Sequence, residues 1–196
     1  MKRLVPLLAL LVAPALVSCG GVEAGGAPPS SDTAMNVEDG VQLEFRMTEE
    51  ALGTTSADCE ARYPDTDGES VTLDADPGEP IDVCAEVDGV LGEVRLAPAI
   101  VRAEHVDYLD FDYGTAGLPT VYVVFDEEGV EAWNAAAAAA TEEDGWPGLV
   151  HIMVEGRSIE VTSSSNLSPK GILQLEGIDT IEEAEAIVNT MATGDR

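Results

Sequence analysis

Hydrophobic and polar residues alternate with a period of two from Val41 to Met47. This period is typical of a β-strand with one buried face, and it predicts the first strand of the chain. A second, short strand is predicted within Val90 to Leu96, where Ala97-Pro98 closes it. The acidic, mixed segment from Val101 to Tyr113 shows no clear period, so no element is predicted there.

The pattern becomes sharper from Thr120 onward. β-Branched and aromatic residues fill Thr120 to Phe125, which predicts a strand. A helix is predicted from about Asp126 to Asp144-Gly145, because apolar residues recur at three- and four-residue spacing and acidic residues occupy the first turn. Its apolar face carries Val130, Trp133 and Ala137.

Three strands and a second helix are predicted in the rest of the chain. The strands are Leu149–Val154, Arg157–Val161 and Ile172–Glu176, and Glu155-Gly156 is the two-residue turn of a hairpin between the first two. The helix opens with a capping box of Thr180 and Glu183, and its inward stripe is Ile181, Ala184, Val188 and Met191. Amphipathic helices bury such stripes against a sheet. The pattern therefore predicts an α+β fold in which both helices pack on one face of an antiparallel or mixed sheet.

The first residues have the layout of a secretory signal. Lys2 and Arg3 precede an apolar stretch from Leu4 to Val17, which is too short to span a bilayer as a helix. Leu16-Val17-Ser18-Cys19 resembles the bacterial lipobox, in which the cysteine receives a lipid before cleavage. We predict a lipoprotein signal peptide over 1–18, lipidation of Cys19, and a location at the outer face of the bacterial cytoplasmic membrane. The alternative is an ordinary signal peptide with an incidental cysteine.

A segment rich in glycine, proline and serine follows Cys19. It has almost no bulky apolar residue, so it cannot bury enough surface to offset its ordering entropy. We therefore predict a flexible, lipidated tether over 19–40. No second hydrophobic run of membrane-spanning length follows in the sequence, which leaves the lipid as the predicted anchor.

The chain is strongly acidic, with 38 acidic and 9 basic residues and a net charge of −29. Loss of Lys2 and Arg3 with the signal leaves 7 basic residues, and 7 − 38 gives −31. Such a surface repels phosphates and anionic headgroups, which excludes nucleic acid and anionic lipid as main partners. The charge serves either solubility in a host with high salt or an acidic proteome, or attraction of a cationic partner or divalent metal ions.

Two cysteines, Cys59 and Cys84, remain besides Cys19. In an exported protein such a pair is typical of a disulfide. The bridge would close a loop of about 26 residues and contribute about 3.5 kcal/mol through chain entropy. A metal site or redox pair is the alternative, but neither cysteine has a histidine nearby and there is no Cys-x-x-Cys. We predict a disulfide-stapled acidic loop within an N-terminal strand region, 41–95.

The sequence offers little for catalysis. His151 lies within an apolar strand, which favours a hydrogen-bonded or edge histidine over a metal ligand. His105 has acidic neighbours, but acidic residues are too abundant for that proximity to be informative. Ser163 to Ser165 has no nucleophile elbow, and Asp65-Thr66-Asp67-Gly68 departs from a calcium loop at its glycine and glutamate positions. We predict no enzyme, no catalytic residue, no cofactor and no metal site, with weak surface calcium binding left open.

Five stretches of the chain match a known family in the family's own order: Val41–Arg46, Leu96–Val101, Phe125–Trp133, Ile152–Arg157 and Thr180–Ala184. The family forms are A-Q-L-E-F-R, L-G-P-A-[VI]-[VLI], a strand before S-E-G-A-x-x-[FW], I-V-L-D-G-K, and F-T-x-E-E-A, where Asp179 replaces the aromatic residue. The chain thus resembles SecD, a subunit of the bacterial preprotein translocase. The likeness covers the head subdomain of its first large extracytoplasmic domain, P1, and extends from about Val41 to Gly194.

The resemblance implies a SecD head-like domain over 96–194 and an affinity for extended polypeptide. SecD also has membrane helices whose ionisable residues couple proton flow to export, and the pattern predicts no such helices here, so no motor activity is implied. Exported polypeptides or membrane protein-export components are the implied partners. An extended segment is expected to add to a sheet edge formed by Arg157, Ser158, Ile159, Glu160 and Val161. The alternative is an anchored solute- or cation-binding module with the same fold.

Overall fold

The computed structural model describes residues 33–52, 76–87, 90–114, 116–142 and 148–195 of the chain. The predicted signal peptide, Cys19, Cys59 and most of the acidic loop lie outside these residues. Residues 33–40, at the end of the predicted tether, contact the folded domain: Met35 bridges to Leu109, and Glu38 N–H donates to Ala192 O at 2.8 Å. No helix in the described ranges is long and apolar enough to cross a membrane.

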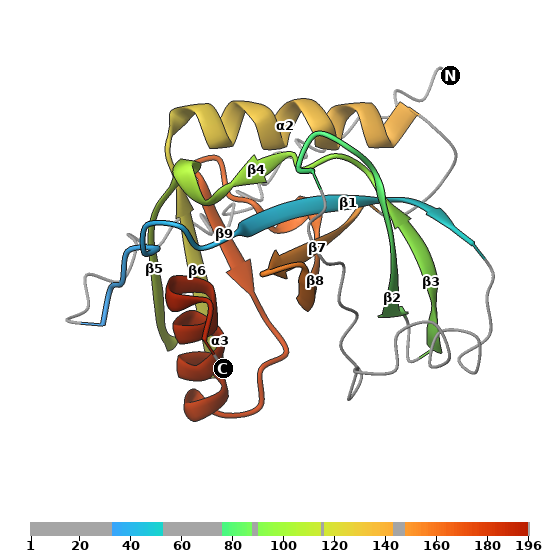
Figure 1. The fold of residues 1–196 in the computed structure, drawn as a ribbon. Coiled ribbons are helices and arrows are strands. Elements are labelled where there is room, and N and C mark those ends of the chain that lie inside the picture. The colour runs from blue at the N-terminus through green and yellow to red at the C-terminus, as the bar shows by residue number, and fades with distance from the viewer. Residues whose placement is uncertain (1–32, 53–75, 88–89, 115, 143–147, 196) are drawn as a thin grey trace, which may run out of the picture.

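The described chain is an α+β fold, as the pattern predicts (Figure 1). Its elements are β1 (Leu43–Ala51), β2 (Ile81–Val87), β3 (Val90–Leu96), β4 (Val101–Arg102), β5 (Val106–Tyr113), β6 (Pro119–Phe125), α2 (Glu127–Glu142), β7 (Leu149–Val154), β8 (Arg157–Ser163), β9 (Ile172–Leu175) and α3 (Ile181–Thr193). The predicted order of strand, helix, three strands and helix after Thr120 is confirmed. Strands β2, β4 and β5 are not in the prediction.

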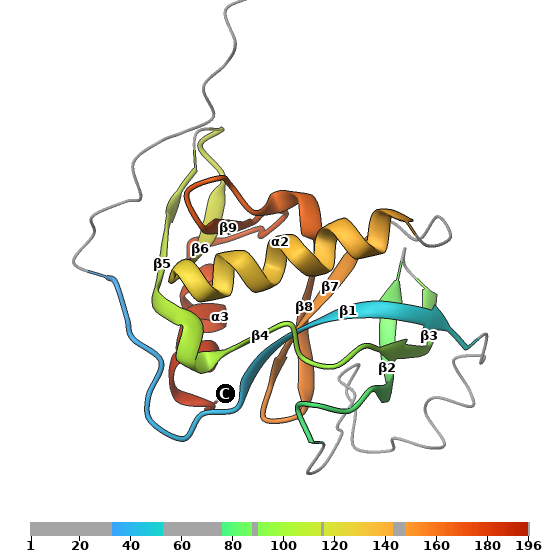
Figure 2. The ribbon, with the colours of Figure 1, turned by 90° about the horizontal axis from the view of Figure 1, so that it is seen from above.

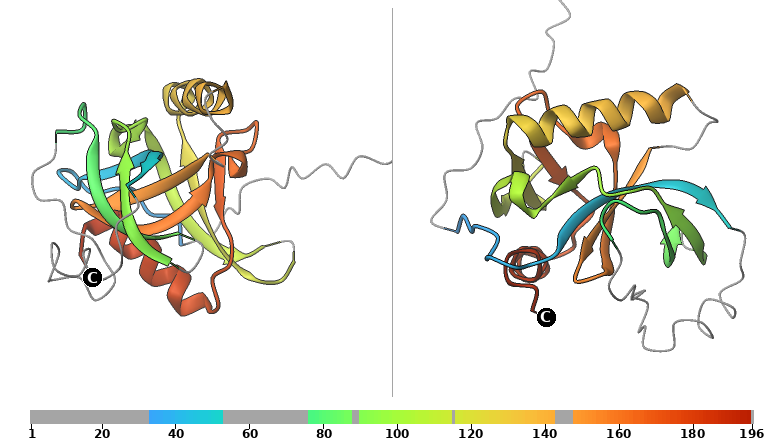
Figure 3. Two further views of the ribbon diagram at one scale, coloured as in Figure 1. Left: turned by 90° about the vertical axis from the view of Figure 1, so that its right-hand side faces the viewer. Right: turned by 45° about the horizontal axis from the view of Figure 1, so that its top comes forward.

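The strands form two antiparallel sheets, where the pattern predicts one. The larger sheet has the order β2-β3-β1-β7-β8, with β4 also paired to β1, and the smaller has the order β5-β6-β9. Seen from above, the smaller sheet lies on one side of α2 and strands β1, β2 and β3 lie on the other (Figure 2). Helix α3 packs on β5 and β6, whereas α2 contacts β4 and β6. The helices lie at opposite ends of the strand layers (Figure 3), so the predicted packing of both on one face of a single sheet is wrong.

The main core fills the space between the two sheets. Three aromatic rings lie at its centre: the Phe45 ring is 5.1 Å from that of Phe125 and 6.1 Å from that of Trp133, and the latter two are 5.6 Å apart. The indole N–H of Trp133 donates to Ser164 O at 2.9 Å, so its polar atom is satisfied. Because Phe45 belongs to β1, the first strand shares its core with the segment that follows residue 96.

The other face of the larger sheet is also covered. Met153 packs there with Val83, Val94 and Leu96. Arg46 is fully buried on this face, forms an ion pair with Glu44 at 2.6 Å, and donates to the carbonyls of Asp76, Glu79 and Ala97. One side chain therefore ties the segment before β2 to β1, since a buried guanidinium needs several acceptors.

Both helices begin at side-chain caps. Gly129 N–H donates to Asp126 Oδ1 at 2.7 Å at the start of α2. One half of the predicted capping box of α3 is present, because Glu183 N–H donates to Thr180 Oγ1 at 3.1 Å. The Glu183 carboxylate accepts from Asp179 N–H, one residue before the cap, at 3.1 Å. The bonds of Gly129 and Glu183 satisfy amides that a helix leaves free at its first turn.

Candidate functional site

Strand β8 begins at a tight hairpin turn whose geometry follows from the sequence. Glu155 and Gly156 both have positive φ, 49° and 75°, as a two-residue turn of this type requires. Glu155 also fixes the turn to the start of β1, because its N–H donates to Gln42 O at 3.0 Å and its carboxylate accepts from Gln42 N–H at 2.9 Å. The turn between β7 and β8 is therefore fixed against the start of β1.

Strand β8 is the last strand of the larger sheet and pairs with β7 on one side. Ser164 N–H donates to Gly148 O at 2.7 Å, which makes these two a hydrogen-bonded pair just beyond the strand. Such pairs occupy every second position of an antiparallel ladder, so positions 162 and 160 are of the same kind. Val161 lies between them, opposite His151, and its N–H and C=O therefore point away from β7.

The outward amide of Val161 has a partner in its own strand. It donates to Glu160 Oε1 at 3.1 Å. Burial raises the pKa of Glu160 above its ordinary value, the Val161 hydrogen bond opposes that rise, and the charge of Glu183 on α3 adds to it. The half-buried Glu160 carboxylate is thus already bonded to the Val161 amide, which is the donor that a neighbouring strand would need.

The remaining side chains of β8 serve different ends. Ile159 packs against the main core, at the point where the register between β7 and β8 shifts. Ser158 Oγ lies 3.1 Å from His151 Nδ1. Arg157 Nε is buried without a hydrogen-bond partner among the described residues, which is unusual for a guanidinium nitrogen.

His151 lies in the interior of the larger sheet, fully buried. Its Nδ1 is 3.1 Å from Ser158 Oγ, and its Nε2 is 3.1 Å from Thr48 Oγ1, so both ring nitrogens have hydroxyl partners. Burial lowers its pKa from 6.5 to about 4. The neutral ring joins three strands, β1, β7 and β8, which agrees with the prediction of a hydrogen-bonded histidine.

His105 and the acidic residues of β5 are not brought together. His105 Nδ1 lies 3.3 Å from Asp126 Oδ2, at the start of α2. The Gly129 amide, ahead of His105, lowers the pKa of Asp126. Asp110 is buried and accepts a hydrogen bond from Thr33 Oγ1 at 2.6 Å. No group of three or more histidine, cysteine or acidic side chains within the described ranges is placed to hold a metal ion.

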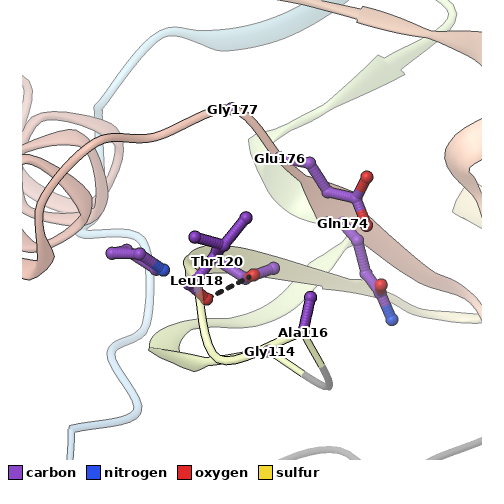
Figure 4. Close-up of a pocket in the computed structure, with 8 residues that line it drawn as sticks. Gly114, Ala116, Leu118, Thr120, Gln174, Glu176 and Gly177 are labelled. Carbon is purple, nitrogen blue, oxygen red and sulfur yellow. Dashed lines mark hydrogen bonds between the residues drawn. The ribbon is translucent and has the colours of Figure 1, made fainter.

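A shallow cleft lies between the β5–β6 turn and the end of β9 (Figure 4). Its volume is about 170 Å³, and Thr120, Gln174 and Glu176 supply its polar side chains. Leu118 at its rim is 60% exposed. Pockets for small organic ligands usually measure about 300–1,000 Å³, so this cleft suits only a small group of atoms. The alternative of a solute- or cation-binding module stays a prediction.

Cys84 is buried in β2, with 2% of its surface exposed. Cys59 lies outside the described residues, so its pairing with Cys84 stays a prediction. The same holds for lipidation of Cys19. The sequence singled out β8 as the candidate edge, but it missed the hydrogen bond between Glu160 and the Val161 amide. A glutamate at a strand position among β-branched and polar neighbours gives no signal that its carboxylate turns to the backbone.

No protein-family model matches this chain, and no curated protein matches it. Two solved structures are similar, both of SecDF. One is SecDF in its super-membrane-facing form: identity is 19%, the TM-score is 0.45, and the match covers 78% of this chain and 18% of the SecDF chain. The other is described as a membrane component that enhances protein export, with the same identity and TM-score, covering 78% of this chain and 62% of the other. The chain thus spans less than two thirds of either SecDF chain.

Proposed function

We propose that this protein is a non-catalytic binding module that captures an extended polypeptide segment by strand addition along β8. The observation that carries the proposal is the edge itself. Strand β8 ends the larger sheet, and the N–H and C=O of Val161 point away from β7. An extended segment supplies the matching carbonyl and amide, which is how strand addition gains its affinity.

The environments of the two histidines support a binding role over a catalytic one. The ring nitrogens of His151 are both engaged by hydroxyls, and His105 lies beside the helix-capping Asp126. A histidine that acts as a catalytic base needs one free ring nitrogen facing a substrate. Strand addition needs only backbone groups and a rigid neighbour, and β7 provides that neighbour because its side chains from Val150 to Val154 are buried.

The proposal includes a lipid anchor on Cys19 and exported polypeptides as the partners. The lipobox-like Leu16-Val17-Ser18-Cys19 supports the anchor, and the five stretches that resemble SecD support the partners. A Cys19→Ala variant is expected to leave the membrane fraction. Retention of that variant in washed membranes after signal cleavage would contradict the anchor and leave strand addition untouched.

Strand addition is tested with a labelled peptide and two variants of one residue. The probe is a nine-residue peptide of alternating threonine and valine with a central lysine, followed by fluorescence anisotropy with the full-length protein in detergent. Val161→Pro removes the outward N–H at an edge position where proline does not interrupt the ladder to β7. Val161→Thr keeps both the N–H and the branched shape and is the matched control.

We expect saturable binding to the wild type and to Val161→Thr, and a loss of at least about tenfold in affinity for Val161→Pro, which corresponds to 1.4 kcal/mol. A peptide N-methylated at alternate residues should also bind weakly, because it cannot complete the ladder. Equal binding of the peptide to both Val161 variants would refute the proposal.

A further inference from the structure

The edge of β8 that has no neighbouring strand is covered by a side chain of β8 itself. Glu160 Oε1 accepts the Val161 amide at 3.1 Å, so the amide that an added strand needs is already bonded. A charged side chain turned toward an exposed edge is a common protection against pairing with the wrong chain. Any segment that adds here must first displace the Glu160 carboxylate from the amide.

The Glu160 carboxylate, once displaced from the amide, has no ion-pair partner in the described structure. Within the described ranges, no ion pair joins Glu160 or Glu183 to a basic group, and the charge of Glu183 on α3 helps to raise the pKa of Glu160. Arg157, the basic residue of β8 itself, lies three positions away, and its Nε is buried without a hydrogen-bond partner. No ion pair among the described residues therefore compensates the charge of Glu160.

Strand addition would bury this charge further. A neighbouring backbone excludes water from both sides of the edge, and a half-buried carboxylate that loses a hydrogen bond is unfavourable unless a charge-assisted bond replaces it. An apolar or acidic side chain beside Glu160 offers no replacement. A lysine or arginine does, and it also relieves the repulsion between the two carboxylates.

We infer that the segment captured by β8 carries a lysine or arginine next to Glu160, so that this carboxylate acts both as the cover of the empty edge and as the selector of a basic segment. The inference rests on the proposed function, because it specifies the ligand of the same edge. It agrees with the overall charge of −29, which attracts cationic segments before contact.

The test compares three peptides that differ only at the central residue of the threonine–valine probe: lysine, glutamine or glutamate. At low salt the wild type is expected to bind the lysine peptide about tenfold more tightly than the glutamine peptide, and the glutamate peptide more weakly still. The preference should shrink as salt is added, because the charges lie near the surface.

Two variants locate the preference. Glu160→Gln keeps an acceptor for the Val161 amide and removes the charge, so the ratio between lysine and glutamine peptides should fall to near one. Glu185→Gln removes one exposed charge from α3 and should leave the ratio unchanged.

The outcomes separate this inference from the proposed function. Suppose that the lysine and glutamine peptides bind equally and that Val161→Pro abolishes both. Strand addition would then stand, and selection by Glu160 would be overturned. A lysine preference that survives in Glu160→Gln would overturn it as well. Failure of all three peptides to bind would overturn both claims.

Discussion

The buried His151 makes the stability of this protein depend on pH in a way that can be calculated. Its pKa falls from 6.5 to about 4 on folding because burial disfavours the charged ring. Between these two values the unfolded chain binds more protons than the folded one. The protein therefore has its full stability, as far as His151 is concerned, above pH 6.5, and it loses stability as the pH falls from 6.5 toward 4.

The size of the effect follows from linkage. The full shift of the pKa corresponds to about 3.4 kcal/mol, and the part expressed between about pH 8 and about pH 5 is about 2 kcal/mol. Replacement by His151→Gln removes the titrating group and keeps polar atoms near Thr48 and Ser158. The variant is expected to be less stable at high pH and to lose less stability on acidification.

The assay is urea unfolding of wild type and His151→Gln at several pH values across this window, and the quantity compared is the difference between the two free energies of unfolding. Carboxylates that titrate in the same window contribute to both proteins and cancel. A difference that stays constant from about pH 8 to about pH 5 would falsify the assignment of a buried, neutral His151.

Three further substitutions test the packing. Arg46→Leu leaves Glu44 and three carbonyls without their donor and should lower the free energy of unfolding by about 3–5 kcal/mol. The control Arg102→Leu, at an exposed ion pair, should change the free energy of unfolding little. Urea titration measures both. Thr180→Ala removes the cap of α3 and should cost about 1 kcal/mol by thermal unfolding, and an unchanged midpoint would contradict the capping role. Gly171→Ala should cost more than about 1 kcal/mol, since φ is +77° and the added Cβ would lie 2.6 Å from a side-chain carbon of α2; Gly177→Ala, with the same sign of φ and open space, controls for backbone strain alone.

The periodic patterns predicted the elements that have one polar and one apolar face. Leu43 and Phe45 face the main core, as the alternation in the first strand requires. The same alternation places Arg46 on the solvent side, and there the prediction fails, because the segment before β2 folds over that face. A second covering layer is a tertiary feature, and the period of one strand does not reveal it.

Strand β5 shows why the acidic segment had no visible pattern. Leu109 faces the core and is buried, while Asp110, next in the chain, is equally buried on the opposite face and accepts a hydrogen bond from Thr33. Two adjacent buried positions break the alternation of a half-buried strand, and the exposed carboxylates of Asp107 and Asp112 suggest a loop. The partner that covers Asp110 comes from far away in the sequence, so local reading could not supply it.

The candidate edge at β8 also combines features that are local in the sequence with features that depend on the whole fold. The hairpin around Glu155-Gly156 and the strand that follows it are local features, and turn chemistry predicted both. The position of β8 at the end of the sheet and the turn of Glu160 toward its neighbour's amide depend on the order of strands. Sequence alone therefore predicted the hairpin and its second strand, whereas the edge position and the hydrogen bond between Glu160 and Val161 come from the fold.

The central claim is that an extended polypeptide adds as a strand along β8. Isotope-filtered NMR of the labelled protein with the unlabelled lysine peptide tests it most directly. We expect cross-strand contacts between backbone protons of the peptide and those of Val161 and Ser163, together with a changed amide shift at Val161. Contacts confined to another surface, such as the cleft beside Thr120 and Glu176, with Val161 unperturbed, would contradict it.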